Sequence, residues 1–137
     1  MAGKKYRKFR KVDSSGLASG NVNLNFGVIG LKVLEGVRIT EKQAESARKV
    51  ISRYIKPHGG MLFINLAHLL PVTKKPLEVR MGGGKGSVDH YVYNCKAGFI
   101  MFEISNVSLE IAREALEKAS KKIPSDTKVI VRRSCLI

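Results

Sequence analysis

The feature that most limits how this chain can fold is a helix with a clear start and a clear stop. Thr40-Glu41-Lys42-Gln43 has the capping-box pattern, in which Thr40 accepts from the Gln43 amide and the Gln43 side chain returns the bond. We predict that the helix runs to about Lys56, because Pro57 and two glycines follow. Its inward stripe is Ala44, Ala47, Ile51, Tyr54 and Ile55.

A second helix is predicted from Leu109 to about Lys122, with Ser108 as its N-cap and Pro124 after its end. Its inward residues are Leu109, Ala112, Ala115, Leu116 and Ala119. The other apolar stretches are short or alternating, which is typical of strands. We expect strands at residues 21–37 with glycine bends, 61–66 as a buried strand, 77–81, 87–95, 99–105 and 127–133.

These elements predict an α+β fold, an antiparallel or mixed sheet with two helices packed on one face. The turn at residues 96–98 predicts an antiparallel hairpin of the strands on either side of it. A length of 137 residues favours one domain. We divide the chain into an N-terminal arm, residues 1–20, and a single α+β domain, residues 21–137.

The charge of the chain is strongly one-sided. It has 25 Lys+Arg against 11 Asp+Glu, a formal net charge of +14, and 44% hydrophobic residues, enough for a packed core. This excess is more than solubility requires, and it favours nucleic acid as the partner. The longest apolar run, residues 61–72, falls short of the roughly 20 residues that span a bilayer, so no membrane partner is expected.

Positive charge is concentrated in the basic N-terminal arm and in the first helix. Residues 1–12 contain six bases and no acid, with Tyr6 and Phe9 among them as stacking candidates. A transit peptide and an unstructured solubilising tail are the alternatives for this arm. On the helix, an ordinary solvated face competes with RNA contact. The candidate RNA-binding residues from these two segments are Lys4, Lys5, Arg7, Lys8, Phe9, Arg10, Lys11, Lys42, Lys49 and Arg53.

A glycine-rich hairpin loop at residues 80–87 is the segment with the most unusual composition. It contains Arg80, Met81, Gly82, Gly83, Gly84, Lys85, Gly86 and Ser87. A P-loop needs Ser or Thr directly after the lysine, and a dinucleotide fingerprint needs a following helix, so both patterns fail here. A mobile tip is one interpretation. A basic tip that becomes ordered inside folded RNA fits the glycines and the two cations better. A nucleotide-phosphate-binding enzyme that uses residues 82–86 is the alternative function.

Other site chemistry is weak in this sequence. The histidines and cysteines lack metal-ligand spacing, and Cys95 and His90 are placed on opposite faces of one predicted strand. We therefore expect no metal, no cofactor and no enzymatic activity. A basic membrane-surface or chaperone-like module is a third option, disfavoured because the first helix presents mostly small alanines.

An ordered series of motifs covers nearly the whole chain. It includes Lys8-Phe9-Arg10-Lys11, Gly30-Leu31-Lys32, Arg38-Ile39-Thr40, Ala112-Arg113-Glu114-Ala115 and, above all, Thr73-Lys74-Lys75-Pro76-Leu77-Glu78-Val79-Arg80-Met81-Gly82. In this series the sequence resembles the universal large-subunit ribosomal protein L sixteen family, in its bacterial and organellar form.

The resemblance implies a structural constituent of the large ribosomal subunit that joins late in assembly. It implies binding to large-subunit ribosomal RNA near the peptidyl transferase centre, help in positioning the A-site transfer RNA, contacts with neighbouring large-subunit proteins, and no small-molecule substrate. Carried over by motif, the residues at 80–87 face transfer RNA, residues 8–11 anchor ribosomal RNA, and the ribosomal-RNA set gains Lys32, Arg38, Lys74 and Lys75.

The chain also departs from the family pattern. Gly83 stands where the family usually has a lysine, residues 12–15 are shorter and less basic, and residues 68–71 are more apolar than usual. These departures favour a mitochondrial ribosome over a bacterial one.

Overall fold

The computed structural model describes residues 7–132, so Lys4, Lys5 and Tyr6 of the predicted arm lie outside the described residues. In chain order the elements are β1 (Ile29–Val33), β2 (Val37–Thr40), α1 (Glu41–Ile55), the 3-10 helix η1 (Lys56–His58), β3 (Met61–Ile64), β4 (Leu69–Lys74), β5 (Ser87–Cys95), β6 (Ile100–Ser105), α2 (Leu109–Ser120) and β7 (Thr127–Val131). Both predicted helices are present, close to the predicted bounds.

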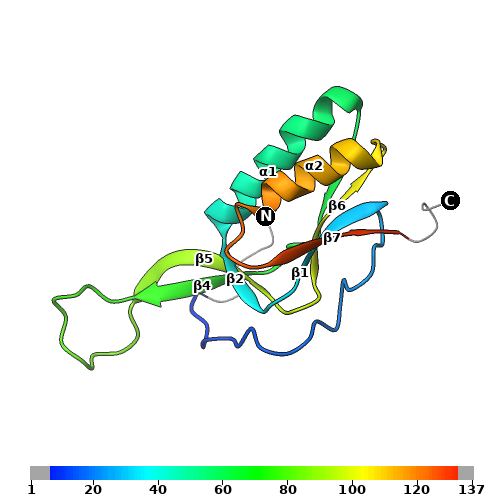
Figure 1. Ribbon diagram of the computed structural model, residues 1–137. Coiled ribbons are helices and arrows are strands. Elements are labelled where there is room, and N and C mark those ends of the chain that lie inside the picture. The colour runs from blue at the N-terminus through cyan, green and yellow to red at the C-terminus, as the bar shows by residue number, and fades with distance from the viewer. Residues whose placement is uncertain (1–6, 133–137) are drawn as a thin grey trace.

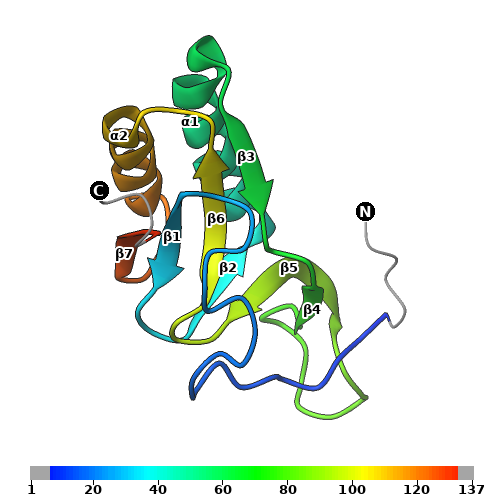
Figure 2. The same ribbon diagram turned by 90° about the vertical axis from the view of Figure 1, so that its right-hand side faces the viewer.

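The strands form two antiparallel sheets. The four-stranded sheet has the order β3-β6-β1-β7, and the three-stranded sheet has the order β2-β5-β4. Both helices lie on one side of the four-stranded sheet, while β4 and β5 extend away from it and end in a long loop (Figure 1; Figure 2). The predicted α+β class is confirmed, but the strands are divided between two sheets where one was expected.

The predicted hairpin of β5 and β6 is wrong. β5 pairs with β2 and β4, whereas β6 pairs with β1 and β3 in the other sheet. The chain changes sheets at residues 96–99, where Gly98 has a φ of 90° and its N–H donates to the Val33 carbonyl oxygen at 2.8 Å. Alternation along a sequence identifies strands but not their partners, and the fully buried run of β6 takes a central position in the four-stranded sheet.

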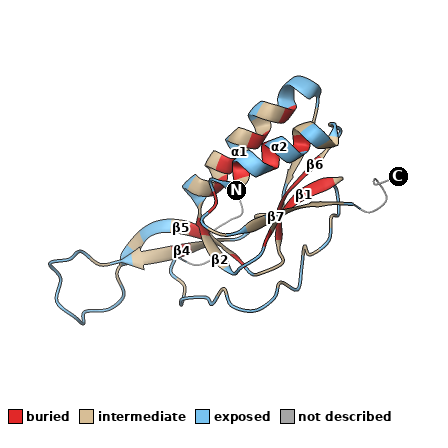
Figure 3. Cartoon of the chain, in the orientation of Figure 1, coloured by how far each residue is buried: buried red, intermediate tan, exposed pale blue. Residues whose placement is uncertain are grey.

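The hydrophobic core lies between the four-stranded sheet and the two helices (Figure 3). The sheet contributes Ile29, Leu31, Val33, Phe102 and Ile104. The helices contribute Ala44, Ala47, Ile51, Ile55, Ala112, Ala115, Leu116 and Ala119, which include most of the two predicted stripes. Five of these eight helix residues are alanines, whose small side chains allow the helices to lie close to their neighbours, and interiors of this kind are packed as tightly as organic crystals.

The helix starts were predicted with mixed success. In the capping box of α1, the Gln43 N–H donates to Thr40 Oγ1 at 3.3 Å and the Thr40 N–H donates to Gln43 Oε1 at 3.0 Å. A cap of this kind stabilises a helix by about 1 kcal/mol. Ser108 occupies the N-cap position of α2 but makes no side-chain capping bond.

Two strand predictions need correction. The segment predicted as a buried strand at residues 61–66 is the shorter β3, an edge strand with Met61 and Ile64 exposed. Residues 77–81 form a turn and bend, and the neighbouring strand is β4 instead. Pro71 argues against a strand at that position, but β4 lies at the edge of its sheet, where a missing N–H is tolerated.

Glu103 is a fully buried charged residue on β6. Its Oε2 accepts from the backbone N–H groups of Asn25, Phe26 and Gly27, at 3.1, 2.8 and 2.7 Å, and its Oε1 accepts from Asn65 Nδ2 at 2.8 Å. Burial raises the pKa of Glu103, but these hydrogen bonds outweigh it and hold the pKa below its usual value. The carboxylate therefore fixes the loop before β1 to the sheet.

Candidate nucleic-acid interface

The end of the arm lies against the three-stranded sheet. The Arg38 guanidinium on β2 donates to the Val12 carbonyl oxygen, and Asn94 Nδ2 on β5 donates to the Asp13 carbonyl oxygen at 3.0 Å. These two bonds use only the backbone of the arm and occupy none of its cationic side chains. Arg7, Lys8, Arg10 and Lys11 are all exposed, whereas Phe9 is partly buried.

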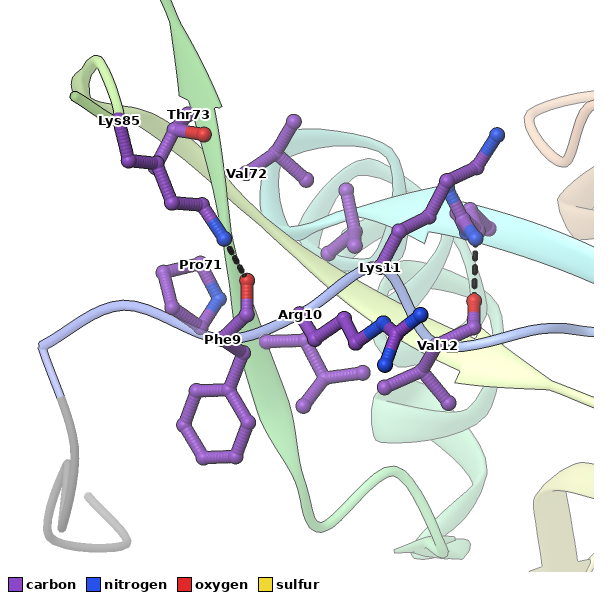
Figure 4. A pocket seen from close by; sticks show the side chains of 11 residues that line it. Phe9, Arg10, Lys11, Val12, Pro71, Val72, Thr73 and Lys85 are labelled. Atoms are coloured by element: carbon purple, nitrogen blue, oxygen red, sulfur yellow. Dashed lines mark hydrogen bonds between the residues drawn. The ribbon is translucent and has the colours of Figure 1, made fainter. Parts of the chain in front are cut away.

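The arm also contacts the glycine-rich loop. Lys85 Nζ donates to the Phe9 carbonyl oxygen (Figure 4). Lys8 Nζ in turn donates to the Lys85 carbonyl oxygen at 3.0 Å. Sequence reasoning treated these two segments separately, and their contact links residues 77 positions apart. Two predicted RNA-binding groups are thereby brought together, and neither cation is neutralised because both acceptors are carbonyl oxygens.

A cavity of about 340 Å³ lies between the arm and β4 (Figure 4). The apolar part of its wall comes from Phe9, Val12, Leu70, Pro71, Val72 and Val92. Arg10, Lys11, Arg38 and Lys85 line it as well. An apolar surface beside several cations suits a nucleotide, whose base is apolar on its faces and whose phosphate is negative.

The loop between β4 and β5, residues 75–86, is shaped by its glycines. Gly82, Gly83 and Gly84 all have positive φ values, of 99°, 71° and 89°, and no atom of residues 7–132 lies within 4 Å of a Cβ added at any of them. Such a backbone favours glycine, and here the reason is conformation and not crowding. Lys75 Nζ donates to the Gly82 carbonyl oxygen at 2.7 Å, while Met81 is fully exposed.

The bases of α1 form one exposed stripe. Lys42, Lys49 and Arg53 are separated by seven and four residues, which places them on one helix face over about 16 Å. The stripe begins beside the three-stranded sheet, near Asp89 on β5. The hydrogen bond from His90 lowers the pKa of Asp89, and the charges of Lys74 on β4 and Lys42 on α1 lower it further, so both lysines lie near this carboxylate. The start of α1 therefore adjoins the end of β4.

Lys32 lies apart from this cluster. It is on β1 in the four-stranded sheet, half-buried, and its Nζ donates to the Val22 carbonyl oxygen at 3.5 Å. Of the other predicted residues, Arg80 is exposed in the loop and Ser87 begins β5. The structure thus brings the arm, Arg38, Lys74, Lys75 and the loop together around one sheet.

Catalytic chemistry finds no support in the part of the chain that is described. Within residues 7–132 no three His, Cys, Asp or Glu side chains are grouped to hold a metal ion. Burial raises the pKa of the Cys95 thiol to about 12, so it carries no thiolate at neutral pH. The residue after the loop begins strand β5, as the sequence predicted, so no helix N-terminus is offered to a phosphate. No described helix is long and apolar enough to cross a membrane.

Comparison with known proteins identifies the family. Residues 1–130 match the family model described as Ribosomal protein L16p/L10e. The chain belongs to this family. It is 48% identical over 128 residues to the large ribosomal subunit protein uL16 of Acidiphilium cryptum, covering 93% of this chain and 92% of the relative. The uL16 of Neorickettsia sennetsu is 46% identical over 131 residues, covering 96% and 94% of the two chains.

Membership of the L16p/L10e family confirms the resemblance that the motifs indicated. The chain is a structural ribosomal protein and not an enzyme, and the nucleotide-phosphate-binding alternative has no support. Glu103 and the arm–loop contact were missed by sequence reasoning. A lone glutamate in the apolar run Phe99–Ser105 was the available signal for Glu103. The arm–loop contact joins distant segments and left no local signal.

Proposed function

We propose that this chain is an RNA-binding structural component of the large ribosomal subunit, with its basic surface held against ribosomal RNA. The basic surface comprises the arm, the three-stranded sheet with its loop, and the stripe of α1. The observation that carries the proposal is that Arg38 and Lys85 hold the arm by its backbone, while Lys8 of the arm bonds back to the loop, so that these cations gather in one place. Lys4 and Lys5 extend the same arm in sequence. Lys32, which lies on β1 apart from this basic surface, is the least supported of the proposed RNA-binding residues.

We further propose that the loop at residues 80–87 reaches toward the A-site transfer RNA near the peptidyl transferase centre. Its three glycines with positive φ leave the backbone open to close approach, and Arg80 and Lys85 supply charge. The resemblance of the motif at residues 73–82 to the family pattern supports this assignment. Neighbouring large-subunit proteins complete the proposed set of partners.

The proposed location is the mitochondrial matrix, in preference to a bacterial cytoplasm. The support is the departure from the family pattern at Gly83 and at residues 68–71. The matched relatives named above are bacterial proteins, so the location needs its own test. Fractionation of cells of the source organism with an antibody to the chain would give a mitochondrial signal if the proposal is right, and a signal confined to a bacterial cytoplasm would refute it.

The direct test is sedimentation of a tagged chain through a salt series. We expect the chain to travel with the large subunit at low salt and to dissociate steeply as salt rises, because phosphate contacts release counterions. A matched variant with Lys8, Arg10 and Lys11 changed to alanine should dissociate at lower salt than the unchanged chain. A chain that sediments alone at low salt would refute the proposal.

A further inference from the structure

Three long stretches of this basic chain, residues 12–31, 57–73 and 97–112, have no lysine or arginine, and the middle one includes an exposed strand. This middle stretch runs from Pro57 to Thr73 and contains β3 and the connection to β4. Its surface is apolar, with Met61 54% exposed and Ile64 46% exposed. Since RNA contact depends on cations, a cation-free apolar surface on a chain of charge +14 calls for a different kind of partner.

β3 also has an unpaired outer edge among the described residues. It is the first strand in the order β3-β6-β1-β7, so only β6 pairs with it. The Asn65 N–H donates inward to the Met101 carbonyl oxygen at 2.9 Å. Because antiparallel pairing alternates, the peptide groups of Leu62 and Ile64 point outward. Natural edge strands usually carry lysine or proline that discourages pairing, and β3 has neither, although it is short.

A groove of about 200 Å³ opens beside this edge, between β3 and the start of α1. Its apolar lining comes from Ala44, Ile64, Leu66 and Phe102, and its charged lining from Glu41, Glu45 and Arg48. Arg48 pairs with Glu45 at 2.7 Å, so the net charge of these three side chains is the negative charge of Glu41.

The acidic side chains of the groove lie close enough to Tyr93 to affect its ionisation. Burial raises the pKa of Tyr93 in the groove wall, and the charges of Glu41 and Glu45 raise it further. A second hollow of about 190 Å³ adjoins the groove through Leu66 and Tyr93, and its lining among the described residues includes no lysine, arginine or acid. The two hollows together offer a path of mixed apolar and amide side chains with an acidic end.

We propose that the outer edge of β3 and this groove bind an extended segment of another large-subunit protein, one that carries a lysine or arginine next to an apolar side chain. The segment adds a strand beside Leu62 and Ile64, places its apolar side chain against Ile64 and Leu66, and sets its cation at Glu41. This mode of recognition takes affinity from main-chain bonds and specificity from alternate side chains. The inference rests on the proposed function, since the partner is met in the subunit.

Charge selects this partner over the alternatives. A phosphate backbone would be repelled at Glu41, and the stripe formed by Lys42 and Lys49 lies on the neighbouring face of α1, directed away from the groove. A symmetric contact between the β3 strands of two copies would bring no cation to Glu41, because the β3 region has no lysine or arginine. The division between RNA and protein partners therefore falls along α1.

The test uses the full chain in the assembled large subunit, with a photoreactive phenylalanine analogue in place of Ile64. The same analogue at Met61 is a second variant, and at Lys74 it is the reference for RNA. After illumination, nuclease and protease digestion with mass spectrometry identifies what is attached. Sedimentation of the unchanged chain is read first, and failure to sediment would refute the proposed function and this inference with it.

We expect residues 61 and 64 to attach to a lysine- or arginine-containing peptide of a different protein, and position 74 to attach to RNA. Glu41→Lys should lower the yield from position 64 about threefold by exchanging attraction for repulsion. Glu110→Lys is the matched control, an exposed glutamate in the first turn of α2, and should leave the yield unchanged. Attachment of position 64 to RNA, to a second copy or to nothing in sedimenting subunits would overturn the inference, as would an unchanged yield in Glu41→Lys.

Discussion

β5 and β6 are consecutive strands in the chain, yet they belong to regions built for different purposes. Every residue of β6 from Ile100 to Ile104 is buried, whereas β5 begins exposed and is buried only toward Cys95. The charged residues near β5 lie mostly on the surface, in the arm and in the loop. The charge within β6 is Glu103, which is fully paired. The region around β6 therefore stabilises the fold, and the region around β5 carries the exposed cations that are proposed to contact a partner.

This division has a physical reason. Cations that must contact phosphate cannot be buried beforehand, because an unpaired buried charge costs many kcal/mol. They are carried instead on a sheet and an arm that need little core. The loop at residues 75–86 illustrates the limit, since its Leu77 and Met81 are fully exposed and its backbone depends on glycine. Changes in the two regions should consequently have separable effects on stability and on binding.

The largest effect is expected from a charge placed in the core. Ile51→Asp or Leu116→Asp should lower the free energy of unfolding by about 5 kcal/mol, enough to unfold a domain of this size, because both side chains are fully buried. Thermal unfolding followed by circular dichroism measures this. Lys49→Asp, on the exposed face of α1, is the control and should stay within about 0.5 kcal/mol of the unchanged chain.

Glu103→Gln should have the next largest effect. Loss of the charge weakens four hydrogen bonds at a buried site, and we expect unfolding to become easier by about 2 kcal/mol at neutral pH. Urea unfolding of Glu103→Gln and of the exposed control Glu110→Gln checks this. Equal stability of the two variants would show that the carboxylate does not hold the loop before β1.

The pH dependence of the same site has a defined sign. The pKa of Glu103 is lower in the folded chain than in the unfolded chain, so its contribution is present at neutral pH. That contribution is lost as the pH falls from the unfolded value, about 4.3, down through the folded value. Urea midpoints between pH 7 and pH 3 should therefore fall more steeply for the unchanged chain than for Glu103→Gln. Parallel curves would contradict the assignment.

These core predictions show what the sequence supplied and what it did not. Helix α1 was predictable because Thr40, Gln43 and Pro57 are local signals, and its buried stripe followed from spacing. The pairing of the strands was not predictable, because the partners of β6 are β1 and β3, which lie far from it in the sequence, and β1 shares its burial in the core. In the candidate site the basic residues could be named individually. The contact of Lys8 with Lys85 could not, since it joins segments separated by the whole of the first half of the fold.

The loop should behave in the opposite way from the core. Changing Arg80 and Lys85 together to alanine removes two phosphate contacts and should reduce the slope of log affinity against log salt by about 1.8 in subunit binding. Late assembly or translation should suffer while the free energy of unfolding stays within about 0.5 kcal/mol. Lys121→Ala with Lys122→Ala, at the end of α2, is the matched control. Normal assembly and an unchanged slope in the loop variant would refute its role.

The smallest effect is expected where the chain departs from its family. Gly83→Lys adds a cation to open space but puts a side chain at a φ of 71°, a local strain of about 1 kcal/mol. We expect the variant to remain on the subunit at slightly higher salt than Gly83→Ala, which carries the same strain without the charge. If the two variants dissociate at the same salt, the loop does not meet phosphate at this position.

Lysine reactivity in the free and assembled chain tests the central division most directly. Mass spectrometry after brief acetylation reports each lysine separately, with Lys42, Lys74 and Lys85 on the basic surface and Lys121 and Lys122 exposed at the end of α2. Assembly into the large subunit should protect the first three and leave the last two reactive. The opposite pattern, with the α2 lysines protected and the basic surface still reactive, would contradict the account.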